Sequence, residues 1–396
     1  MLLIKGGTVI LSGEAPGAKM DLLVKDGRII EMSESIPVLN DMTVLDVTGL
    51  TVAPGLVDIH VHFREPGFEY KEDILSGAEA AAAGGFTLCC CMPNTMPVID
   101  GKEITESVVR KAKLAIVEVL PIGAVTVGQK GLELTDFSSL MNAGAVALSD
   151  DGLPIVSDEI MRNALLAAEA ADMLIISHCE EEEPMVERDI KLAAETVARV
   201  HIAHVSTKAA VDAIRKAKAA GVKVTAEACP HHFSLTEATV TSIGTNAKMS
   251  PPLRTDSDVQ AVIQGLCDGT IDAIVTDHAP HSIEEKELPF EKAPNGIIGL
   301  ETALAVTLTH LYHTGTLSLE KIINLMSTNP ASLLDLDAGI LKVGGHADIV
   351  IFDPNKEWTV DPSRFKSKSR NSPYDGMTLQ GKVKYTISGG KLVYRY

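Results

Sequence analysis

The sequence is short of positive charge and has no long apolar run, and each absence excludes a class of partner. Lysine and arginine number 35 against 53 aspartates and glutamates, which gives a formal net charge of −18. Because nucleic acids and anionic membranes are bound through basic faces, we expect neither as a partner. No apolar run approaches the roughly 20 residues that a membrane-spanning helix needs. The start, MLLIKGGTVILSGE, is apolar only briefly, so we expect no signal peptide and a cytoplasmic protein.

Cysteine pairs with the spacing of a zinc finger are missing as well. Three of the six cysteines are consecutive and none forms a Cys-x-x-Cys pair; they are Cys89, Cys90, Cys91, Cys179, Cys229 and Cys267. A disulfide framework is not expected in a chain of this size. We therefore interpret the cysteines as small buried residues in a reducing compartment. The sequence also has no glycine-rich phosphate loop, internal repeat or low-complexity tract.

The chain does have enough apolar sequence for a large core, between two ends of similar texture. Hydrophobic residues make up 45% of the 396 residues, which suits two domains or one large α/β barrel with an accessory part. Asp26-Gly27 and Gly389-Gly390 each separate two apolar arms, a pattern typical of tight β-hairpins. We therefore predict one small β-sandwich domain built from both termini, residues 1–50 and 339–396.

Residues 51–338 alternate strand-length apolar runs with amphipathic helical stretches. The runs number eight, at 57–61, 87–92, 116–122, 145–148, 173–176, 200–203, 222–226 and 273–275. Stretches between them, such as TKAAVDAIRKAKAAG, repeat apolar residues at i, i+3 or i+4 and i+7. Eight strands with helical crossovers predict an α/β fold, a (β/α)8 TIM-type barrel whose active site lies at the carboxyl ends of the strands.

Histidines and aspartates follow the predicted strands at these ends. His60 and His62 alternate in the first strand, so both imidazoles point to one face and are near enough to share a metal. The ends of the fourth, fifth, sixth and eighth strands add, in this order, Asp150 and Asp151, then His178, then His201 and His204, and then Asp277, His278 and His281. Barrel geometry brings these side chains to one rim although they are scattered along the sequence.

The count of these donors predicts the number of metals. Four imidazoles and two carboxylates are counted among them: His60, His62, His178, His204, Asp151 and Asp277. This number exceeds what one tetrahedral zinc with an open position requires. They suit two metals per chain that share a bridging carboxylate. Zinc fits imidazole and carboxylate ligands best, and other divalent metals are alternatives. A hydroxide shared by two such metals would be a nucleophile at neutral pH.

Other polar residues near the predicted rim have a structural interpretation. His231 and His232 follow the seventh strand and could reach the rim, but we favour packing behind it. His201 is expected to point away from His204 or to lie within packed structure. The acidic run at 180–183 could be read as a ligand cluster. We favour solvated carboxylates at a helix start, where the helix dipole attracts negative charge.

Eight segments stand out in order along the chain: VDIHVHFREPG, CMPNT, SDDG, SHCE, HVSTKAAV, PPLR, TDHAPHSIEEK and GGHADIVIFD. Together they resemble the amidohydrolase superfamily and, within it, the type I dihydroorotases. The resemblance covers essentially the whole chain. It implies a zinc-dependent enzyme that reversibly hydrolyses the cyclic amide of dihydroorotate to N-carbamoyl-L-aspartate in pyrimidine biosynthesis.

The resemblance also implies a role for each predicted ligand. One metal would be surrounded by His60, His62, Asp151 and Asp277, and the other by Asp151, His178 and His204. Asp151, immediately before the glycine of SDDG, matches the bridging ligand of the family. Asp277 would in addition act as general base and acid, taking a proton from the hydroxide and delivering it to the leaving amide nitrogen.

Seven positions match substrate contacts of the family: His62, Arg64, Asn94, Ser250, His281, Asn295 and Gly296. Arg64 can hold the ring carboxylate in a bidentate fork, unless it pairs with Glu65 or Asp73 instead. Asn94 and Asn295 also have a simple turn-forming interpretation. Ser250 stands where the family has an asparagine, so its contact would pass through water or be lost.

The chain departs from the family pattern between His178 and His204, where 25 residues form a shorter segment than usual and leave a rim loop in doubt. Hydantoinases and allantoinases, the alternative enzymes, use a carboxylated lysine as bridge, and no lysine lies between Lys130 and Lys191. A silent scaffold subunit for aspartate carbamoyltransferase would lack ligands, whereas all six are present here. We expect a homo-oligomer, with aspartate carbamoyltransferase as a second candidate partner.

Overall fold

A closed barrel of parallel strands forms the centre of the molecule, and the computed structural model describes it together with the rest of residues 1–12 and 16–396. One sheet has the order β6-β7-β8, with β6 (Leu56–Val61), β7 (Phe86–Cys91) and β8 (Glu118–Pro121). The other has the order β12-β11-β10-β9, with β9 (Ile175–Ser177), β10 (Val200–Ile202), β11 (Val224–Ala228) and β12 (Ala273–Ile274).

Isolated bridges close these two sheets into a ring. Leu148 pairs in parallel with Gly123 on one side and with Ile175 on the other, and Val61 pairs in parallel with His278. The predicted fourth strand at 145–148 is therefore reduced to bridging at Leu148. This prediction was wrong in extent, because bridges form on both sides of the segment only at that residue. The α/β barrel itself, with eight positions around the ring, is confirmed.

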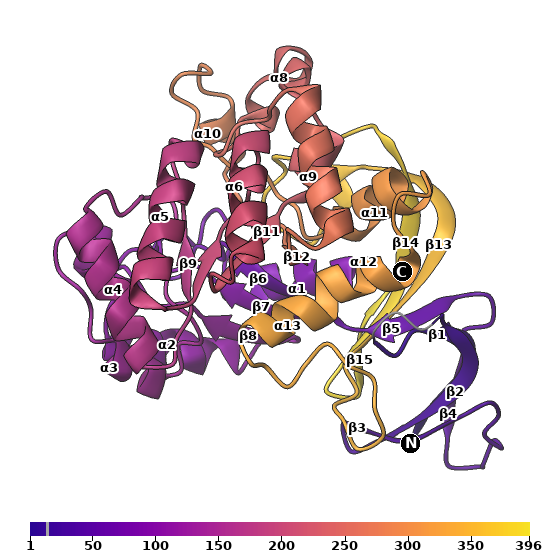
Figure 1. The fold of residues 1–396 in the computed structure, drawn as a ribbon. Helices are drawn as coiled ribbons and strands as arrows, with labels where there is room; N and C mark the ends of the chain where they lie inside the picture. Colours follow the sequence, from indigo (N-terminus) through magenta and orange to yellow (C-terminus); the bar gives the residue numbers. More distant parts are fainter. Residues whose placement is uncertain (13–15) are drawn as a thin grey trace.

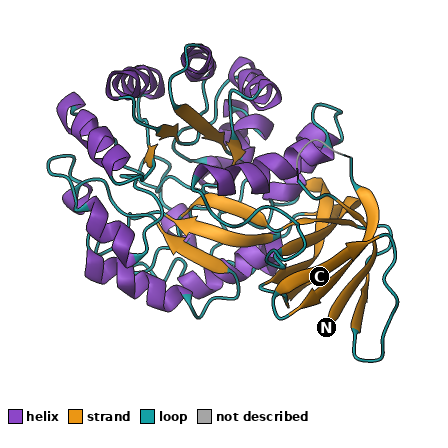
Figure 2. Ribbon diagram, turned by 60° about the horizontal axis from the view of Figure 1, so that its bottom comes forward, coloured by secondary structure: helices purple, strands orange, loops and turns teal. Residues whose placement is uncertain are grey.

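Helices surround the barrel on the outside (Figure 1, Figure 2). The longer ones are α1 (Ile74–Gly84), α2 (Lys102–Ala112), α3 (Phe137–Ala143), α4 (Asp158–Ala170), α5 (Glu182–Thr196), α6 (Lys208–Ala219), α8 (Glu237–Ile243) and α9 (Asp256–Asp268). The shorter ones are α7 (Pro230–Ser234), α10 (Ile283–Lys286), α11 (Ala303–Thr307), α12 (Leu319–Ile323) and α13 (Asn329–Leu333). No described helix is both long and apolar enough to cross a membrane.

Several crossover helices begin where a side chain accepts hydrogen bonds from the free amides of the first turn. Asp73 caps α1, Ser157 caps α4, and Thr207 caps α6. Such a cap contributes about 1 kcal/mol, because it satisfies a donor that has no partner within the helix. These local signals fix where each helix leaves the rim of the barrel, and so fix the lengths of the loops that carry the site.

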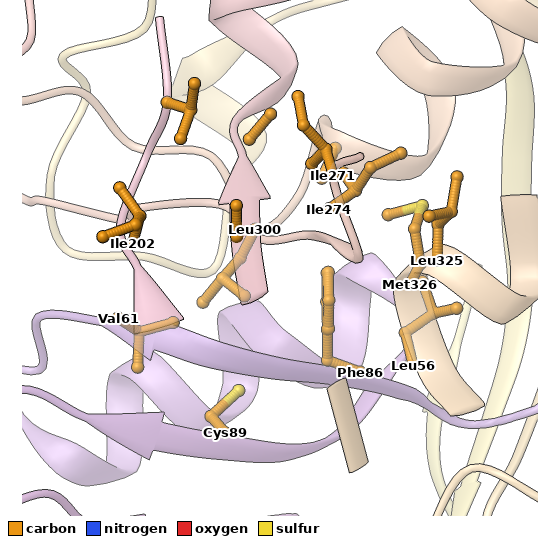
Figure 3. Packing of buried hydrophobic residues seen from close by; sticks show 14 of the residues in the cluster. Leu56, Val61, Phe86, Cys89, Ile202, Ile271, Ile274, Leu300, Leu325 and Met326 are labelled. Carbon is orange, nitrogen blue, oxygen red and sulfur yellow. The ribbon is translucent and has the colours of Figure 1, made fainter. Parts of the chain in front are cut away.

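Buried side chains fill the barrel and the layer between strands and helices. Val57, Ile59, Leu88 and Ile176 belong to one apolar cluster of buried strand residues. Val61, Phe86 and Ile202 belong to a second, larger cluster that also includes buried helix residues (Figure 3). All six cysteines are free and five of them are buried, which agrees with the interpretation from the sequence. The filled interior leaves the rim as the place for chemistry.

Strands from the two ends of the chain form a separate sheet in the order β15-β14-β13-β5-β1-β2-β3, with β4 paired to β1. Its strands are β1 (Leu2–Val9), β2 (Ala18–Lys25), β3 (Arg28–Ser33), β4 (Thr43–Asp46), β5 (Thr51–Pro54), β13 (Ile349–Thr359), β14 (Thr378–Ser388) and β15 (Lys391–Arg395). Both hairpin turns have positive φ at their central residues, 50° and 78° at Asp26 and Gly27, and 53° and 75° at Gly389 and Gly390. This is the conformation that the sequence pattern predicts.

Candidate active site

The His-x-His pair lies at the end of β6, where the strand meets the rim. Both side chains are buried, and their ring centroids lie 5.5 Å apart. Every residue of β6 is buried, so the strand holds the two imidazoles on a rigid support. Alternation along the strand places them on one face, as the spacing predicts.

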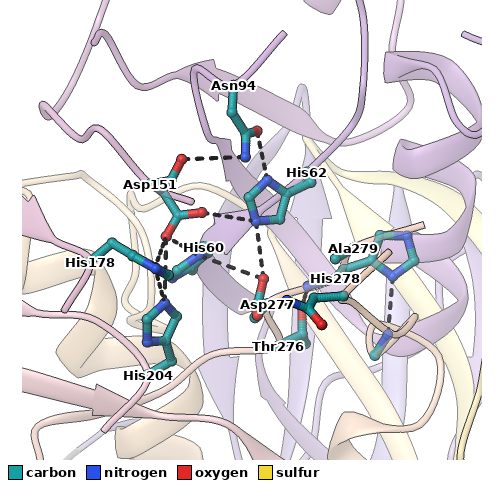
Figure 4. A network of polar contacts seen from close by, with 12 residues as sticks. His60, His62, Asn94, Asp151, His178, His204, Thr276, Asp277, His278 and Ala279 are labelled. Carbon is teal, nitrogen blue, oxygen red and sulfur yellow. Dashed lines mark hydrogen bonds and ion pairs between the residues drawn. The ribbon is translucent and has the colours of Figure 1, made fainter. Parts of the chain in front are cut away.

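One carboxylate lies among four imidazoles. Asp151 Oδ1 is 3.3 Å from His60 Nε2 and from His178 Nδ1, and 3.5 Å from His204 Nε2. Its other oxygen, Oδ2, is 3.3 Å from His62 Nε2. Figure 4 shows these side chains converging from separate segments of the chain. Oδ1 of Asp151 therefore faces three candidate ligands and Oδ2 faces the fourth, an arrangement that suits a bridging carboxylate.

Asp277 approaches the His-x-His pair from the other side. Its Oδ1 lies 3.0 Å from His62 Nε2 and 3.7 Å from His60 Nε2. The backbone φ angle is 47° at Asp277 and 34° at His204. Positive φ is uncommon for residues other than glycine, and such strained positions concentrate at functional sites.

Two buried polar atoms at the centre of this cluster have no hydrogen-bond partner among the described residues. They are His60 Nε2 and Asp151 Oδ1. A buried donor or acceptor without a partner costs about 1–3 kcal/mol. The ligand atoms of His60, His62 and Asp277 lie within 4.8 Å of one another, as do those of His60, Asp151 and His204. Imidazole nitrogens and carboxylate oxygens suit a divalent cation such as zinc, so these residues fit a metal.

The electrostatics of the cluster keep its carboxylates ionised. Burial opposes the charge on Asp151, but His60, His178 and His204 hold its pKa well below the ordinary value. Burial likewise opposes charge on Asp277, and its hydrogen bond to His62 and the nearby His60 lower that pKa too. Two negative side chains therefore persist at neutral pH in a buried place that attracts cations.

Glu227 on β11 lies behind His60, and the sequence analysis missed it. Its carboxylate is 2.5 Å from His60 Nδ1 and 3.1 Å from His201 Nε2, while His201 Nδ1 lies 2.8 Å from Thr225 Oγ1. Burial opposes its charge, yet His60 and His201 lower the pKa of Glu227 to about 2. A carboxylate that accepts from Nδ1–H leaves the Nε2 lone pair of His60 for a metal. The feature of the sequence that could have indicated this residue is a glutamate within an otherwise apolar strand.

Asn94 supports His62 in the same way. Its Oδ1 lies 2.8 Å from His62 Nδ1, and its Nδ2 donates to the backbone carbonyl of Asp151 at 3.4 Å. The amide therefore connects the two sides of the cluster. Its side chain also faces the cavity, where the sequence predicts a substrate contact.

A cavity of about 350 Å³ opens above this cluster. It brings together every predicted substrate residue and every predicted ligand except His60, which is fully buried beneath it. The lining residues are His62, Arg64, Asn94, Asp151, Gly152, His178, Glu180, His204, Ser250, Asp277, Ala279, His281, Asn295 and Gly296. Residues up to 234 positions apart in the chain, His62 and Gly296, thus line one chamber at the rim.

Arg64 supplies positive charge to this cavity and has neither of the structural ion pairs considered from the sequence. Its Nε donates to the carbonyl of Pro280 at 3.2 Å. Glu65 instead lies 3.4 Å from Lys111, and Asp73 pairs with Lys368. The Nη2 of Arg64 lies 3.3 Å from His281 Nε2. Among the described residues, Arg64 has no carboxylate within ion-pair distance, so its positive charge is available to an anionic ligand.

His281 is held neutral at the edge of the cavity. Its Nε2 donates to the carbonyl of Asn295 at 2.8 Å, and Lys71 Nζ lies 3.4 Å from its Nδ1. Burial lowers the pKa of His281 to about 3, with the charges of Arg64 and Lys71 acting in the same direction. Lys71 in turn forms an ion pair with Glu285 at 2.9 Å. Lys71 is a second residue near the cavity that the sequence analysis did not single out.

The acidic run at the start of α5 was predicted to be solvated, and at Glu182 this prediction is wrong. This side chain is 5% exposed rather than solvated. It accepts hydrogen bonds from the backbone amides of Ser206 and Thr207, both at 2.9 Å, and lies 3.5 Å from Arg254. The segment after His204 turns back toward α5, and its free amides attract the carboxylate inward. Of its neighbours, Glu180 is exposed and lines the cavity.

Comparison with known proteins identifies relatives over the full length. The Amidohydrolase family matches residues 51–393. A dihydroorotase of Syntrophus aciditrophicus is 47% identical over 423 residues, covering 100% of this chain and 99% of the relative. A dihydroorotase of Ruminiclostridium cellulolyticum is 48% identical over 422 residues, covering 100% and 98%. The first alignment is 27 positions longer than the chain, 423 against 396, so the relative has residues that this chain lacks.

Solved structures show the same architecture. The L-hydantoinase (dihydropyrimidinase) of Arthrobacter aurescens superposes with a TM-score of 0.91 at 27% identity, covering 100% of this chain and 96% of the other. A D-hydantoinase superposes with a TM-score of 0.90 at 24% identity, covering 99% and 95%. The second likeness is one of fold alone. The fold of the whole chain, barrel and terminal sheet together, is therefore similar to that of these hydantoinases.

Proposed function

The chain belongs to the amidohydrolase family, and we propose that it is a dihydroorotase. The reaction is the reversible hydrolysis of (S)-dihydroorotate to N-carbamoyl-L-aspartate, a step in the formation of UMP. The observation that carries the proposal is the chamber in which Asp151, among four imidazoles, lies below the unpaired guanidinium of Arg64. Such a chamber combines ligands for a hydrolytic metal with a receptor for a carboxylate. Identities of 47% and 48% with dihydroorotases over the full length support it.

The proposed cofactor is zinc, two ions per chain. His60, His62, Asp151 and Asp277 would hold one ion, and Asp151, His178 and His204 the other. The unpartnered atoms His60 Nε2 and Asp151 Oδ1 support this assignment. When bound, a metal pair supplies Lewis acidity to the amide carbonyl and lowers the pKa of an attacking water. Glu227 fixes the orientation of His60 and its tautomer.

Asp277 is the proposed general base and acid. Its carboxylate lines the chamber and is held ionised, so it can accept the proton of the attacking water. The same oxygen then delivers this proton to the ring nitrogen as the amide bond breaks. His281 is unsuited to this task, because its Nε2–H is donated to Asn295 and its Nδ1 faces Lys71.

Arg64 is the proposed receptor for the substrate carboxylate. A guanidinium matches the two oxygens of a carboxylate geometrically, and Arg64 is half-buried in the wall of the chamber. Asn94, Ser250, His281 and the backbone at Asn295 and Gly296 line the same chamber and complete the proposed contacts. Ser250 lies in this lining, so a shorter side chain still reaches the place where the family has asparagine.

A hydantoinase is the second candidate, because a hydantoinase superposes with a TM-score of 0.91. The bridging position, however, holds Asp151 rather than a lysine. Hydantoin also lacks the carboxylate that Arg64 would bind. The substrate preference therefore separates the two activities.

The test is an assay of the purified, zinc-supplemented chain with dihydroorotate, N-carbamoyl-L-aspartate, hydantoin and allantoin side by side. We expect turnover of dihydroorotate in both directions and little activity toward the other two rings. Preferred hydrolysis of hydantoin would replace the proposal with the second candidate. A chain that binds two zinc ions yet turns over none of these compounds would instead be a silent scaffold.

A further inference from the structure

We propose that Cys229, His231 and His232 form a further metal site, separate from the cluster around Asp151, that binds zinc through one thiolate and two imidazoles. These residues lie where β11 ends and the short helix α7 begins. None of the three lines the substrate chamber. The site goes beyond the proposed hydrolysis and would hold its metal for structural reasons.

The three side chains are close and buried. One ligand atom of each lies within 4.8 Å of those of the other two. Cys229 is fully buried and each imidazole is 2% exposed. Donors around a tetrahedral zinc lie about 3–4 Å apart, since Zn–N is about 2.0–2.1 Å and Zn–S about 2.3 Å. Small side-chain rotations are therefore enough to close the three donors around one ion.

Unpartnered nitrogens point to a ligand in this place. His231 Nε2 and His232 Nδ1 are buried without a hydrogen-bond partner among the described residues. His232 Nε2 lies 3.0 Å from the carbonyl of Pro251, so this nitrogen carries the proton and donates it. Because Nε2 of His232 carries the proton, Nδ1 of His232 has a lone pair that can bind a metal. The two rings lie with their centroids 4.3 Å apart. Each unsatisfied nitrogen costs about 1–3 kcal/mol, and one cation bound by both would remove this cost.

The charge around the cluster is compatible with a cation. Burial lowers the pKa of His231 well below its ordinary value and that of His232 to about 4, so both imidazoles are neutral ligands at physiological pH. Burial, together with the carboxylates of Asp277 and Glu227, raises the pKa of the Cys229 thiol. The negative charges of these carboxylates oppose ionisation of the free thiol. They favour a metal cation that is bound to the Cys229 sulfur.

The donor types favour zinc over harder cations. A thiolate with two imidazoles is a soft ligand set that calcium and magnesium do not prefer. A metal held here would brace α7 against the carbonyl of Pro251, the residue after Ser250 in the chamber wall. We therefore expect the ion to stabilise the wall without entering the reaction.

Cobalt provides a specific readout, because the cluster around Asp151 contains no cysteine. The thiolate is the metal-binding form of cysteine, and bound to Co²⁺ it absorbs strongly in the near ultraviolet. Full-length protein is produced in medium with Co²⁺ as the only added divalent transition metal, so that a buried site fills during folding. We expect a cobalt–thiolate band and one cobalt per chain more than a Cys229→Ser variant binds.

The matched control is Cys179→Ser, a buried cysteine near Ser177 and Asp189 and outside the cluster. The band must persist in this variant and disappear in Cys229→Ser. A His231→Gln variant serves as a second probe if Cys229→Ser does not fold, and it must weaken the band. Wild-type protein that binds cobalt without a thiolate band, or a band that survives in Cys229→Ser, would overturn the proposal.

Discussion

Asp277 combines two proposed tasks in one side chain, and an amide in its place separates them. Asparagine keeps an oxygen for a metal but cannot accept a proton from water. We predict that Asp277→Asn retains its metals and hydrolyses dihydroorotate at least about a hundredfold more slowly, within the range of general acid–base catalysis. Metal analysis and kcat are measured on the same preparation. Full activity at full metal occupancy would remove Asp277 as the base.

Arg64 makes a second residue-scale prediction. Its replacement by methionine keeps the volume and removes the charge that faces the chamber. We predict that Arg64→Met raises KM for dihydroorotate by roughly 10–150-fold, since a hydrogen bond to a charged group contributes about 1.5–3 kcal/mol. Metal content serves as the control and is expected to stay unchanged. Unaltered KM and kcat would place the substrate carboxylate elsewhere.

At the scale of elements, Glu182 joins α5 to the loop after β10. Its buried carboxylate accepts from two backbone amides and faces Arg254, and Ser206 lies two residues after the proposed ligand His204. We predict that Glu182→Ala lowers the free energy of unfolding by about 2–3 kcal/mol, because buried donors lose a charged acceptor. The exposed neighbour Glu183, changed to alanine, is the matched control. Equal denaturation midpoints for the two variants would contradict this role.

Glu301 links the barrel to the segment before β14, and we expect its contribution to stability to depend on pH. Its carboxylate accepts from the amides of Lys366 and Ser367, at 2.7 and 3.1 Å. Burial raises its pKa from 4.5 to about 7. Between these values the native state holds a proton that the unfolded state releases, so this group makes stability fall as the pH rises from 4.5 to about 7.

We therefore predict that Glu301→Gln, which is neutral at every pH, gains stability over the wild type across this window. The gain is expected to grow from pH 4.5 and to level off above about pH 7. Denaturant midpoints of both proteins, measured at intervals over this range, test the sign. A constant difference between the two curves would mean that Glu301 does not titrate there.

At the scale of the whole molecule, the proposed zinc ligands come from segments all around the barrel, from His60 in β6 to Asp277 after β12. A metal that binds only the folded state stabilises it by RT ln(1 + [L]/Kd), about 4 kcal/mol at a thousandfold excess over Kd. We predict that a chelator lowers Tm and that zinc restores it. Asp151→Ala is expected to have the low Tm with and without zinc. If a chelator left the Tm of metal-loaded wild-type protein unchanged, a metal that links distant segments of the barrel would be contradicted.

The sequence by itself determined much of the fold, because the signals concerned are local. Alternation and turn residues located the hairpins at Asp26 and Gly389, and helical periodicity located the crossovers. The order of strand and helix then allows few topologies, of which the closed barrel is one. Spacing and resemblance also selected the residues that the structure gathers in one chamber. Their roles as ligands, base and substrate contacts stay predictions.

Only the tertiary structure decided what depends on contacts between distant segments. The predicted fourth strand forms β-bridges only at Leu148. Strand pairing depends on segments that are distant in the sequence, and the periodicity of one segment carries no information about them. Glu182 turned inward because free amides after β10 lie opposite it. Glu227 lies beside His60, and Lys71 lies beside His281, because the closed barrel brings these distant segments together. Burial and charge act over space rather than along the chain, so the protonation of these groups follows from the folded neighbourhood alone.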